Sequence, residues 1–304
     1  MNEFPLKKQV GESPTIELVL YVNKSTYLYR ERKIMIREKQ VKAGRLLDID
    51  FFPINPSGRR IPERAPKTNP SSEEQQMYNY NRATKRVIEL INANFDERDY
   101  ICSPTFTVDN SPKTEEELDN MIKNFIRRVN DYKKRRGLER SLYIYVREVA
   151  IYKSGKKKGL PNPHLHMIIH GRGVDRDTLK RLWKNGHLDV DEYDPDTFGP
   201  ETFCKYIRKD PQGKKNYVCA KGLKQPIVKP HKDGRIGRKA VERMGTIHID
   251  DKDYWERRYP GYRFIRCFSR FNKYNSHWYV SVVMFKNKPI SNNKPTAAGK
   301  GGRR

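Results

Sequence analysis

Apolar residues recur at helical spacing in two long segments of the chain. Residues 73–95 and residues 114–136 each place apolar side chains along one helical face, which predicts two amphipathic helices. The second begins with the capping box Thr114-x-x-Glu117 and ends in consecutive basic residues followed by Gly137. These start and stop signals support the same boundaries.

Shorter apolar runs have the length and composition of strands. We expect strands over residues 16–22, 46–52, 100–108, 142–149, 163–170, 188–193, 262–268 and 277–285, and short helices over residues 175–184 and 200–209. Residues 211–260 are expected to be rich in loops. The order β-α-β-β-α-β between residues 100 and 193 is ferredoxin-like and predicts a central antiparallel sheet with helices on one face. The predicted fold class is therefore α+β.

Composition divides the chain into three parts. Residues 1–70 read as a β-containing N-terminal extension and linker, and residues 71–286 as the main domain. Residues 287–304 carry five basic residues and no acidic ones, with many Gly, Asn and Pro. We expect this basic tail to be disordered.

The charge of the chain indicates a polyanionic partner. The 304 residues include 63 Lys and Arg against 37 Asp and Glu, a formal net charge of +26. Nucleic acid is the usual partner of so basic a protein. No apolar run reaches the roughly 18–20 residues of a membrane helix. The N-terminus lacks the apolar core of a secretory signal and there is no Cys-x-x-Cys pair, so we expect a cytoplasmic protein.

The strand over residues 163–170 carries His164-Leu165-His166. Residues i and i+2 of a strand face the same way, about 6–7 Å apart at Cα, so two imidazoles can converge on one metal ion. Glu148 ends the preceding strand, and a hairpin would place it beside them. Two imidazoles and one carboxylate leave coordination positions open, as a catalytic site requires. This mixture of ligands suits Mn²⁺ and admits Mg²⁺ or Zn²⁺. The alternatives without a metal are a solvated strand face for the two histidines and an ordinary surface acid for Glu148.

Tyr206 and Lys209 form a Tyr-x-x-Lys motif in the helix expected over residues 200–209. The spacing i, i+3 puts both on one face of a helix. A phenol has a pKa near 10 and needs a nearby cation to act as a nucleophile, which Lys209 would supply. The alternative is an ordinary amphipathic helix with a buried tyrosine.

The order of these motifs resembles that of the HUH endonucleases: a strand with a glutamate, a basic loop, a His-Leu-His strand and a Tyr-x-x-Lys helix. The similarity is to phage- and plasmid-type rolling-circle replication initiators with a single nucleophilic tyrosine, and it covers roughly residues 35–285. The family's first motif, a Thr-rich strand, is matched by residues 105–107 only after an interruption at Ser103-Pro104. The resemblance implies a ferredoxin-like HUH endonuclease core preceded by an N-terminal extension.

The resemblance also implies an activity. His164, His166 and Glu148 would hold a divalent metal ion, Mn²⁺ or Mg²⁺, and Tyr206 would attack the scissile phosphate with Lys209 beside it. The product would be a 5′-phosphotyrosine link and a free 3′-hydroxyl that can prime synthesis. Such an enzyme nicks single-stranded DNA at a replication origin and rejoins it.

Other contacts and partners follow from the same reading. Basic residues that could hold single-stranded DNA are Lys156, Lys157, Lys158, Arg208, Lys214 and Lys215. The chain has no Gly-x4-Gly-Lys-[Ser/Thr] loop, so duplex unwinding would come from a host helicase and synthesis from a host DNA polymerase. The expected location is the cytoplasm of a bacterial host cell.

Four alternatives remain open at this point. The charge and tail fit a non-catalytic DNA- or RNA-binding protein equally well. A relaxase uses the same chemistry, but usually with the tyrosine N-terminal to a three-histidine cluster. A single-tyrosine transposase would be shorter, and a metal-dependent phosphodiesterase would need no tyrosine.

Overall fold

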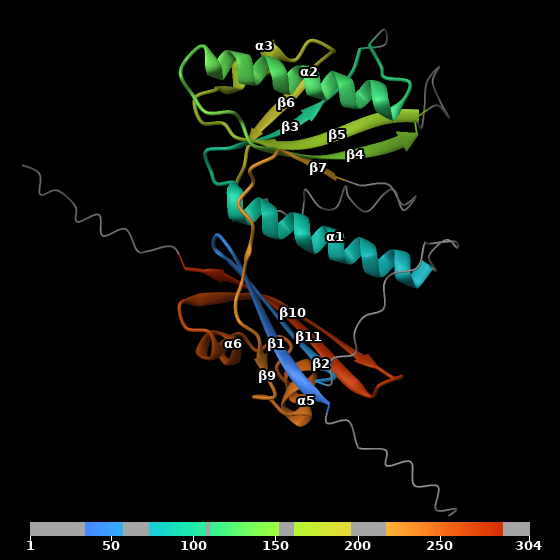
Figure 1. The fold of residues 1–304 in the computed structure, drawn as a ribbon, viewed down its shortest axis with the longest axis vertical. Coiled ribbons are helices and arrows are strands. Elements are labelled where there is room, and N and C mark those ends of the chain that lie inside the picture. Colours follow the sequence, from blue (N-terminus) through green and yellow to red (C-terminus); the bar gives the residue numbers. More distant parts are fainter. Residues whose placement is uncertain (1–33, 57–72, 108–109, 152–160, 196–216, 288–304) are drawn as a thin grey trace, which may run out of the picture.

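The structure is a computed structural model, and it describes residues 34–56, 73–107, 110–151, 161–195 and 217–287. Five helices and eleven strands lie in these ranges (Figure 1). The helices are α1 (Glu73–Asn94), α2 (Glu115–Lys134), α3 (Arg176–Leu182), α5 (Arg238–Thr246) and α6 (Lys252–Arg258). The strands are β1 (Met35–Ala43), β2 (Leu46–Ile54), β3 (Tyr100–Pro104), β4 (Tyr143–Ile151), β5 (Pro161–Ile169), β6 (Leu188–Glu192), β7 (Tyr217–Cys219), β8 (Ile227–Val228), β9 (Lys232–Asp233), β10 (Tyr262–Asn272) and β11 (His277–Lys286).

The strands form two antiparallel sheets, which confirms the α+β class. The five-stranded sheet has the order β6-β3-β5-β4-β7, and its elements from β3 to β6 follow the expected order β-α-β-β-α-β. Strand β5 pairs with both β3 and β4, so the connection through α2 joins two strands that are not neighbours. This arrangement is the split βαβ unit.

The second sheet draws its strands from both ends of the chain. Its order is β10-β11-β2-β1-β8, and β9 also pairs with β1. Strand β2 pairs with β11 from Phe51 opposite Val280 to Leu46 opposite Phe285. Strands on both sides of the boundary expected at residue 70 therefore share one sheet, in which residues 35–54 form inner strands.

Helices α5 and α6 correct the prediction that residues 211–260 are rich in loops. Helix α5 buries only Val241, Met244 and Gly245, and α6 buries only Trp255. So few buried residues produce almost no hydrophobic periodicity in a basic sequence, so the pattern of apolar residues does not predict these helices. Both helices pack on the outer face of the six-stranded sheet, α5 mainly against β11 and α6 against β10 (Figure 1).

Helices α2 and α3 cover the outer face of the five-stranded sheet (Figure 1). The expected cap of α2 is confirmed in part, because the Thr114 side chain accepts a hydrogen bond of 3.1 Å from the Glu117 N–H. Phe125 in the middle of α2 packs among Leu165 and Met167 of β5 in the largest buried cluster. Alternate residues of β5 thus enter the core beneath α2.

Helix α1 lies between the two sheets and contributes to a core on each side (Figure 1). Val87 and Ile91 are fully buried with Val146 of the five-stranded sheet. Ile88 and Ala93 pack against the buried cluster that holds Phe285 of the six-stranded sheet. One helix therefore fixes the inner faces of both sheets.

A charged cluster joins α1 to the six-stranded sheet. The Nζ atom of Lys85 lies 2.9 Å from Asp48 Oδ1 and 2.8 Å from Asp50 Oδ1, and Ser281 donates a 2.7 Å hydrogen bond to Asp50. Burial raises the pKa of Asp48 to about 6, and the nearby Asp50 carboxylate adds to this rise. The two carboxylates raise the pKa of Lys85 in turn, so its ammonium group stays charged.

Replacing Lys85 with Met should destabilise the fold by about 2 kcal/mol at neutral pH, since it leaves two carboxylates without their cation. The effect is smaller than for a fully buried pair because 32% of the Lys85 side chain is exposed. The free energy of unfolding from urea titration measures it. Lys123→Met, at an exposed position of α2, is the matched control and should change stability by less than about 0.5 kcal/mol. Equal effects of the two substitutions would contradict this account.

Asp48 should also make stability depend on pH. A carboxyl whose pKa is raised by folding from about 4 to about 6 binds more protons in the folded state, so its contribution to stability falls as the pH rises through that window. We expect wild type to lose stability relative to Asp48→Asn between pH of about 4 and about 7. Urea titrations of both proteins across this range test it, and a constant difference would contradict it.

Candidate functional site

The strand β5 is divided between two faces of the five-stranded sheet. Leu165, Met167 and Ile169 are buried on the face under α2, each with at most 1% of its surface exposed. Ile168 is buried in the cluster that includes α1, on the opposite face. His166 alternates with the first set and is half-buried on the α1 side. The histidine positions of β5 therefore belong to the sheet face that α1 also covers.

Strand pairing brings the predicted ligand positions into register. Strands β4 and β5 form the expected antiparallel pair, with Glu148 opposite His164 and Val146 opposite His166. Residues directly opposite in such a pair have Cα atoms about 4.5–5.5 Å apart. The side chains of Glu148 and His164 lie outside the described part of the structure, so their ligation of a metal stays a prediction.

Ser103 supplies a contact to His166 that the sequence did not reveal. Its Oγ lies 3.3 Å from His166 Nδ1. Strand β3 ends at Pro104, earlier than expected, because proline lacks the N–H that would continue the ladder. The Ser-Pro step that interrupts the Thr-rich motif thus places a hydroxyl beside the histidine. No local signal in the sequence marks this contact, because it depends on β3 pairing with β5.

Thr105 is turned toward structural partners. Its N–H and its hydroxyl both donate to the His187 carbonyl, at 2.8 and 3.2 Å, and its own carbonyl accepts a 3.3 Å bond from Trp183 Nε1. The Thr107 N–H donates to the Asn185 carbonyl. These bonds tie the chain after β3 to the turn before β6.

His170 is a structural residue at the end of β5. Its Nε2 lies 3.0 Å from the Asn94 carbonyl at the end of α1, and its ring meets Phe95 edge to face at 5.1 Å between centroids. The ring therefore bonds the helix end to the sheet.

A row of residues crosses the sheet at His166. Tyr217 of β7 pairs with Val146 of β4, which pairs with His166 of β5. With neighbouring strands about 4.8 Å apart, the Tyr217 and His166 backbones are separated by about 10 Å. Burial raises the pKa of the Tyr217 phenol, which disfavours its phenolate.

The remaining predicted site residues fall outside the described part of the structure. Lys156, Lys157 and Lys158 belong to the connection from β4 to β5. Tyr206, Arg208, Lys209, Lys214 and Lys215 belong to residues 196–216, which precede β7. The chain enters β7 at Tyr217, in the row of His166.

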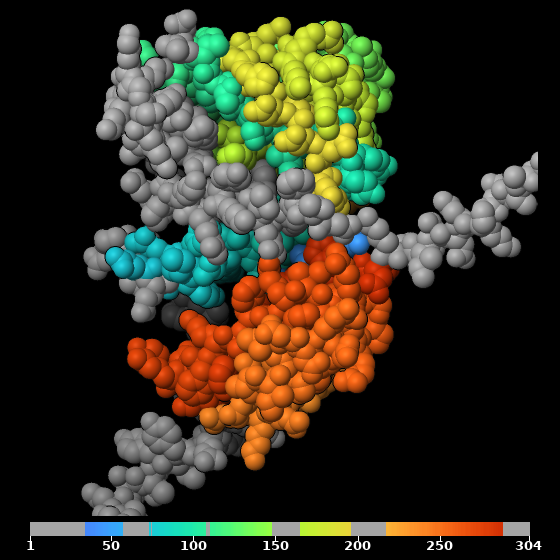
Figure 2. All heavy atoms as spheres, turned by 180° about the vertical axis from the view of Figure 1, so that it is seen from behind, coloured from blue at the N-terminus to red at the C-terminus, as the bar shows by residue number. Residues whose placement is uncertain are grey.

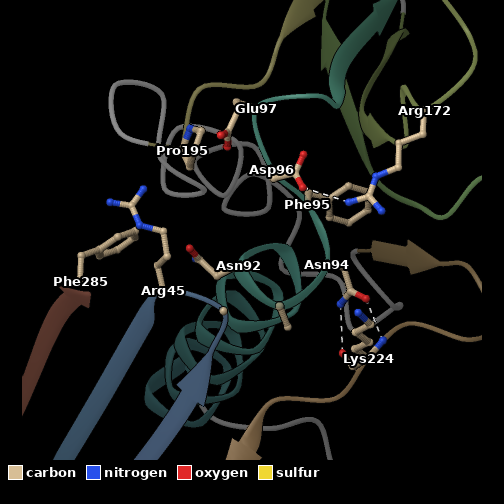
Figure 3. A pocket seen from close by; sticks show the side chains of 12 residues that line it. Arg45, Asn92, Asn94, Phe95, Asp96, Glu97, Arg172, Pro195, Lys224 and Phe285 are labelled. Carbon is tan, nitrogen blue, oxygen red and sulfur yellow. Dashed lines mark hydrogen bonds and ion pairs between the residues drawn. The ribbon is translucent and has the colours of Figure 1, made fainter. Parts of the chain in front are cut away.

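A concave region lies where α1 ends between the sheets (Figure 3). It encloses about 270 Å³ and is lined by both charged and apolar residues. Asn94 exchanges two hydrogen bonds with the backbone of Lys224, at 2.8 and 3.0 Å, and Asp96 pairs with Arg98 and Arg172. These ion pairs hold the pKa of Asp96 well below its usual range. These polar groups thus tie the end of α1 to the loops that follow β5 and β7.

The turn between β1 and β2 borders the same region. Gly44 has φ of +56°, and a Cβ at this position would collide with the Asn92 carbonyl of α1. Only glycine combines this left-handed conformation with so close an approach of two backbones. The region is therefore a packed junction between α1 and the six-stranded sheet.

No family model matches this chain, and neither a curated protein nor a solved structure matches it. The described helices all lack the length and apolar character needed to cross a membrane. Among the described side chains, which exclude Glu148 and His164, no group of three His, Cys, Asp or Glu residues is suited to a metal ion.

Proposed function

We propose that the chain is an HUH-type rolling-circle replication initiator that nicks single-stranded DNA and rejoins it through a phosphotyrosine intermediate. The observation that carries the proposal is the strand register, which sets Glu148 opposite His164 next to the row of His166. The ferredoxin-like order of the surrounding elements supports it, as does the net charge of +26.

The donor set fits a divalent metal ion. His164, His166 and Glu148 would hold Mn²⁺ or Mg²⁺, and Ser103 would orient His166 by bonding its Nδ1 atom. A bound divalent cation polarises a phosphate and neutralises its charge. The negative charge of the Glu148 carboxylate would also offset part of the positive charge of the metal ion, which two neutral imidazoles cannot do.

Tyr206 would be the nucleophile. Its phenol oxygen forms a bond to phosphorus while the bond from phosphorus to the 3′-oxygen breaks, and that oxygen leaves as a hydroxyl carrying the proton. Lys209 favours the phenolate and stabilises charge on the phosphate. The entry of the chain into β7 at Tyr217, eleven residues after Tyr206 and in the row of His166, supports this placement.

The wider roles follow from the chemistry. Lys156, Lys157, Lys158, Arg208, Lys214 and Lys215 would bind the DNA backbone. A host helicase and DNA polymerase in a bacterial cytoplasm would unwind the duplex and extend the free 3′-hydroxyl. The chief alternative is a basic nucleic-acid-binding protein without catalysis.

Tyr206→Phe should abolish a metal-dependent protein–DNA adduct, because phenylalanine lacks the attacking oxygen. The assay uses labelled single-stranded DNA of the protein's own replicon with Mn²⁺ or EDTA, read on a denaturing gel. Tyr217→Phe is the matched control, since this tyrosine lies in the row of His166 but has a raised pKa, and it should retain the adduct. Cleavage that survives Tyr206→Phe would mean that water attacks. Binding of origin DNA without any cleavage would favour the non-catalytic alternative.

Ser103→Ala should weaken Mn²⁺ binding by about tenfold or more, because the second hydrogen bond of a ligating imidazole sets its orientation. Ser103→Thr keeps the hydroxyl and suits a strand, so it should bind nearly as wild type does. Free Mn²⁺ measured by electron paramagnetic resonance gives the affinity without any activity assay. Identical affinities for wild type and Ser103→Ala would exclude a role of Ser103 at a metal.

A further inference from the structure

The hairpin of β10 and β11 has an unusual composition. Residues 262–286 contain no Asp or Glu. Their basic residues are Arg263, Arg266, Arg270, Lys273 and Lys286, and their aromatic residues are Tyr262, Phe264, Phe268, Phe271, Tyr274, Trp278, Tyr279 and Phe285. Strand β10 is the edge of its sheet, and the hairpin projects from the lower half of the molecule, below α1 (Figure 2). A positive and aromatic strip is therefore presented at an open edge.

The two faces of the hairpin differ in what covers them. Cys267 and Val282 are buried in the cluster beneath α5 and α6. The register sets Phe268 opposite Ser281. The Ser281 hydroxyl donates a hydrogen bond to Asp50, and Asp50 pairs with Lys85 of α1. Phe268 therefore belongs to the face toward α1. Yet 58% of its surface is exposed, so the helix leaves this part of the face open.

Cations lie over the aromatic rings of this open part. The Arg266 guanidinium is 5.2 Å from the ring centre of Phe268, and that of Arg270 is 5.8 Å from the ring centre of Tyr279. Arg266, Phe268 and Arg270 alternate along β10 and so share the face. At the tip, Lys273 Nζ lies 5.4 Å from the ring centre of Tyr274, which is 90% exposed.

We infer that these six residues, here termed the hairpin platform, form a stacking surface for single-stranded DNA. The platform consists of Arg266, Phe268, Arg270, Lys273, Tyr274 and Tyr279. Exposed rings can stack on unpaired bases while adjacent cations bind phosphates, and such a combination is how proteins hold single strands without reading sequence. Exposed aromatic surface bordered by charged groups is typical of a binding site.

Charge selects the occupant of the platform. A surface without a single acidic residue attracts a polyanion, and its exposed rings favour one whose bases are accessible. In a duplex the base faces are stacked on each other and out of reach. The inference rests on the proposed function in that a nicking enzyme must hold single-stranded DNA, and it adds a second contact on the sheet that does not carry the histidines.

The test measures binding by the full chain, without cleavage. Fluorescence anisotropy of a labelled oligothymidine gives the dissociation constant at about 0.15 M salt. The variant Phe268→Ala/Tyr274→Ala should bind about a hundredfold more weakly, since each of the two lost base stacks is worth roughly a factor of ten. Binding of a duplex of equal length should be unchanged. Urea unfolding curves confirm that each variant is folded.

Phe271→Ala is the matched control. Phe271 is also exposed, by 47%, and lies in the same strand, but its ring contacts Trp278 on the α5 side. It should bind DNA as wild type does. Arg270→Gln should reduce the slope of log K against log salt concentration by about 0.7, as expected for one lost phosphate contact on a single strand.

The outcomes separate this inference from the proposed function. Wild-type affinity in Phe268→Ala/Tyr274→Ala, or an equal loss in Phe271→Ala, overturns the platform even if the protein nicks DNA. Selective loss in the double variant supports the platform even if cleavage survives Tyr206→Phe and the phosphotyrosine proposal fails. Photocrosslinking with iodouracil-containing DNA gives a second reading, with crosslinked peptides expected from residues 262–279 of the hairpin.

Discussion

The architecture depends on helix α1 being buried from two directions. A helix on the surface of a domain needs one apolar stripe, but α1 presents Val87 and Ile91 to one sheet and Ile88 to the other. The ion cluster of Lys85 with Asp48 and Asp50 then sets its position on the six-stranded sheet, because a buried carboxylate is tolerated only beside its cation. Neither sheet could complete its inner core without this helix.

How much the sequence predicts depends on the distance over which a signal acts. The periodicity of apolar residues predicted α1 and α2, and Thr114 marked the start of α2. The pairing of β4 with β5 was also predicted, because these strands are consecutive in the sequence. The pairing of β2 with β11 joins segments more than 200 residues apart, and no local pattern specifies such a partner. Asp48 and Asp50 lie on the same face of β2, and Lys85 of α1 lies over that face. This pairing depends on the tertiary fold, so the sequence alone does not reveal it.

The candidate site shows the same division. The His-x-His spacing is a local property of a strand, and so is the pairing of Glu148 with His164 across a short hairpin. The contact of Ser103 with His166 depends on β3 lying beside β5, with α2 inserted between the strands in sequence. The Ser-Pro step read as a defect of the Thr-rich motif because its purpose is visible only once the sheet is assembled.

The same helix connects the hairpin platform to the sheet that carries the histidines. Phe268 is opposite Ser281, which bonds Asp50, which is held by Lys85 of α1. Two residues further along the helix, Val87 is buried with Val146, the direct partner of His166. These are short contacts between packed or ion-paired groups, so the separation of the hairpin platform from His166 is fixed by the fold. A strand lying on the platform would thus be held at a set distance from the histidine row, with α1 between them.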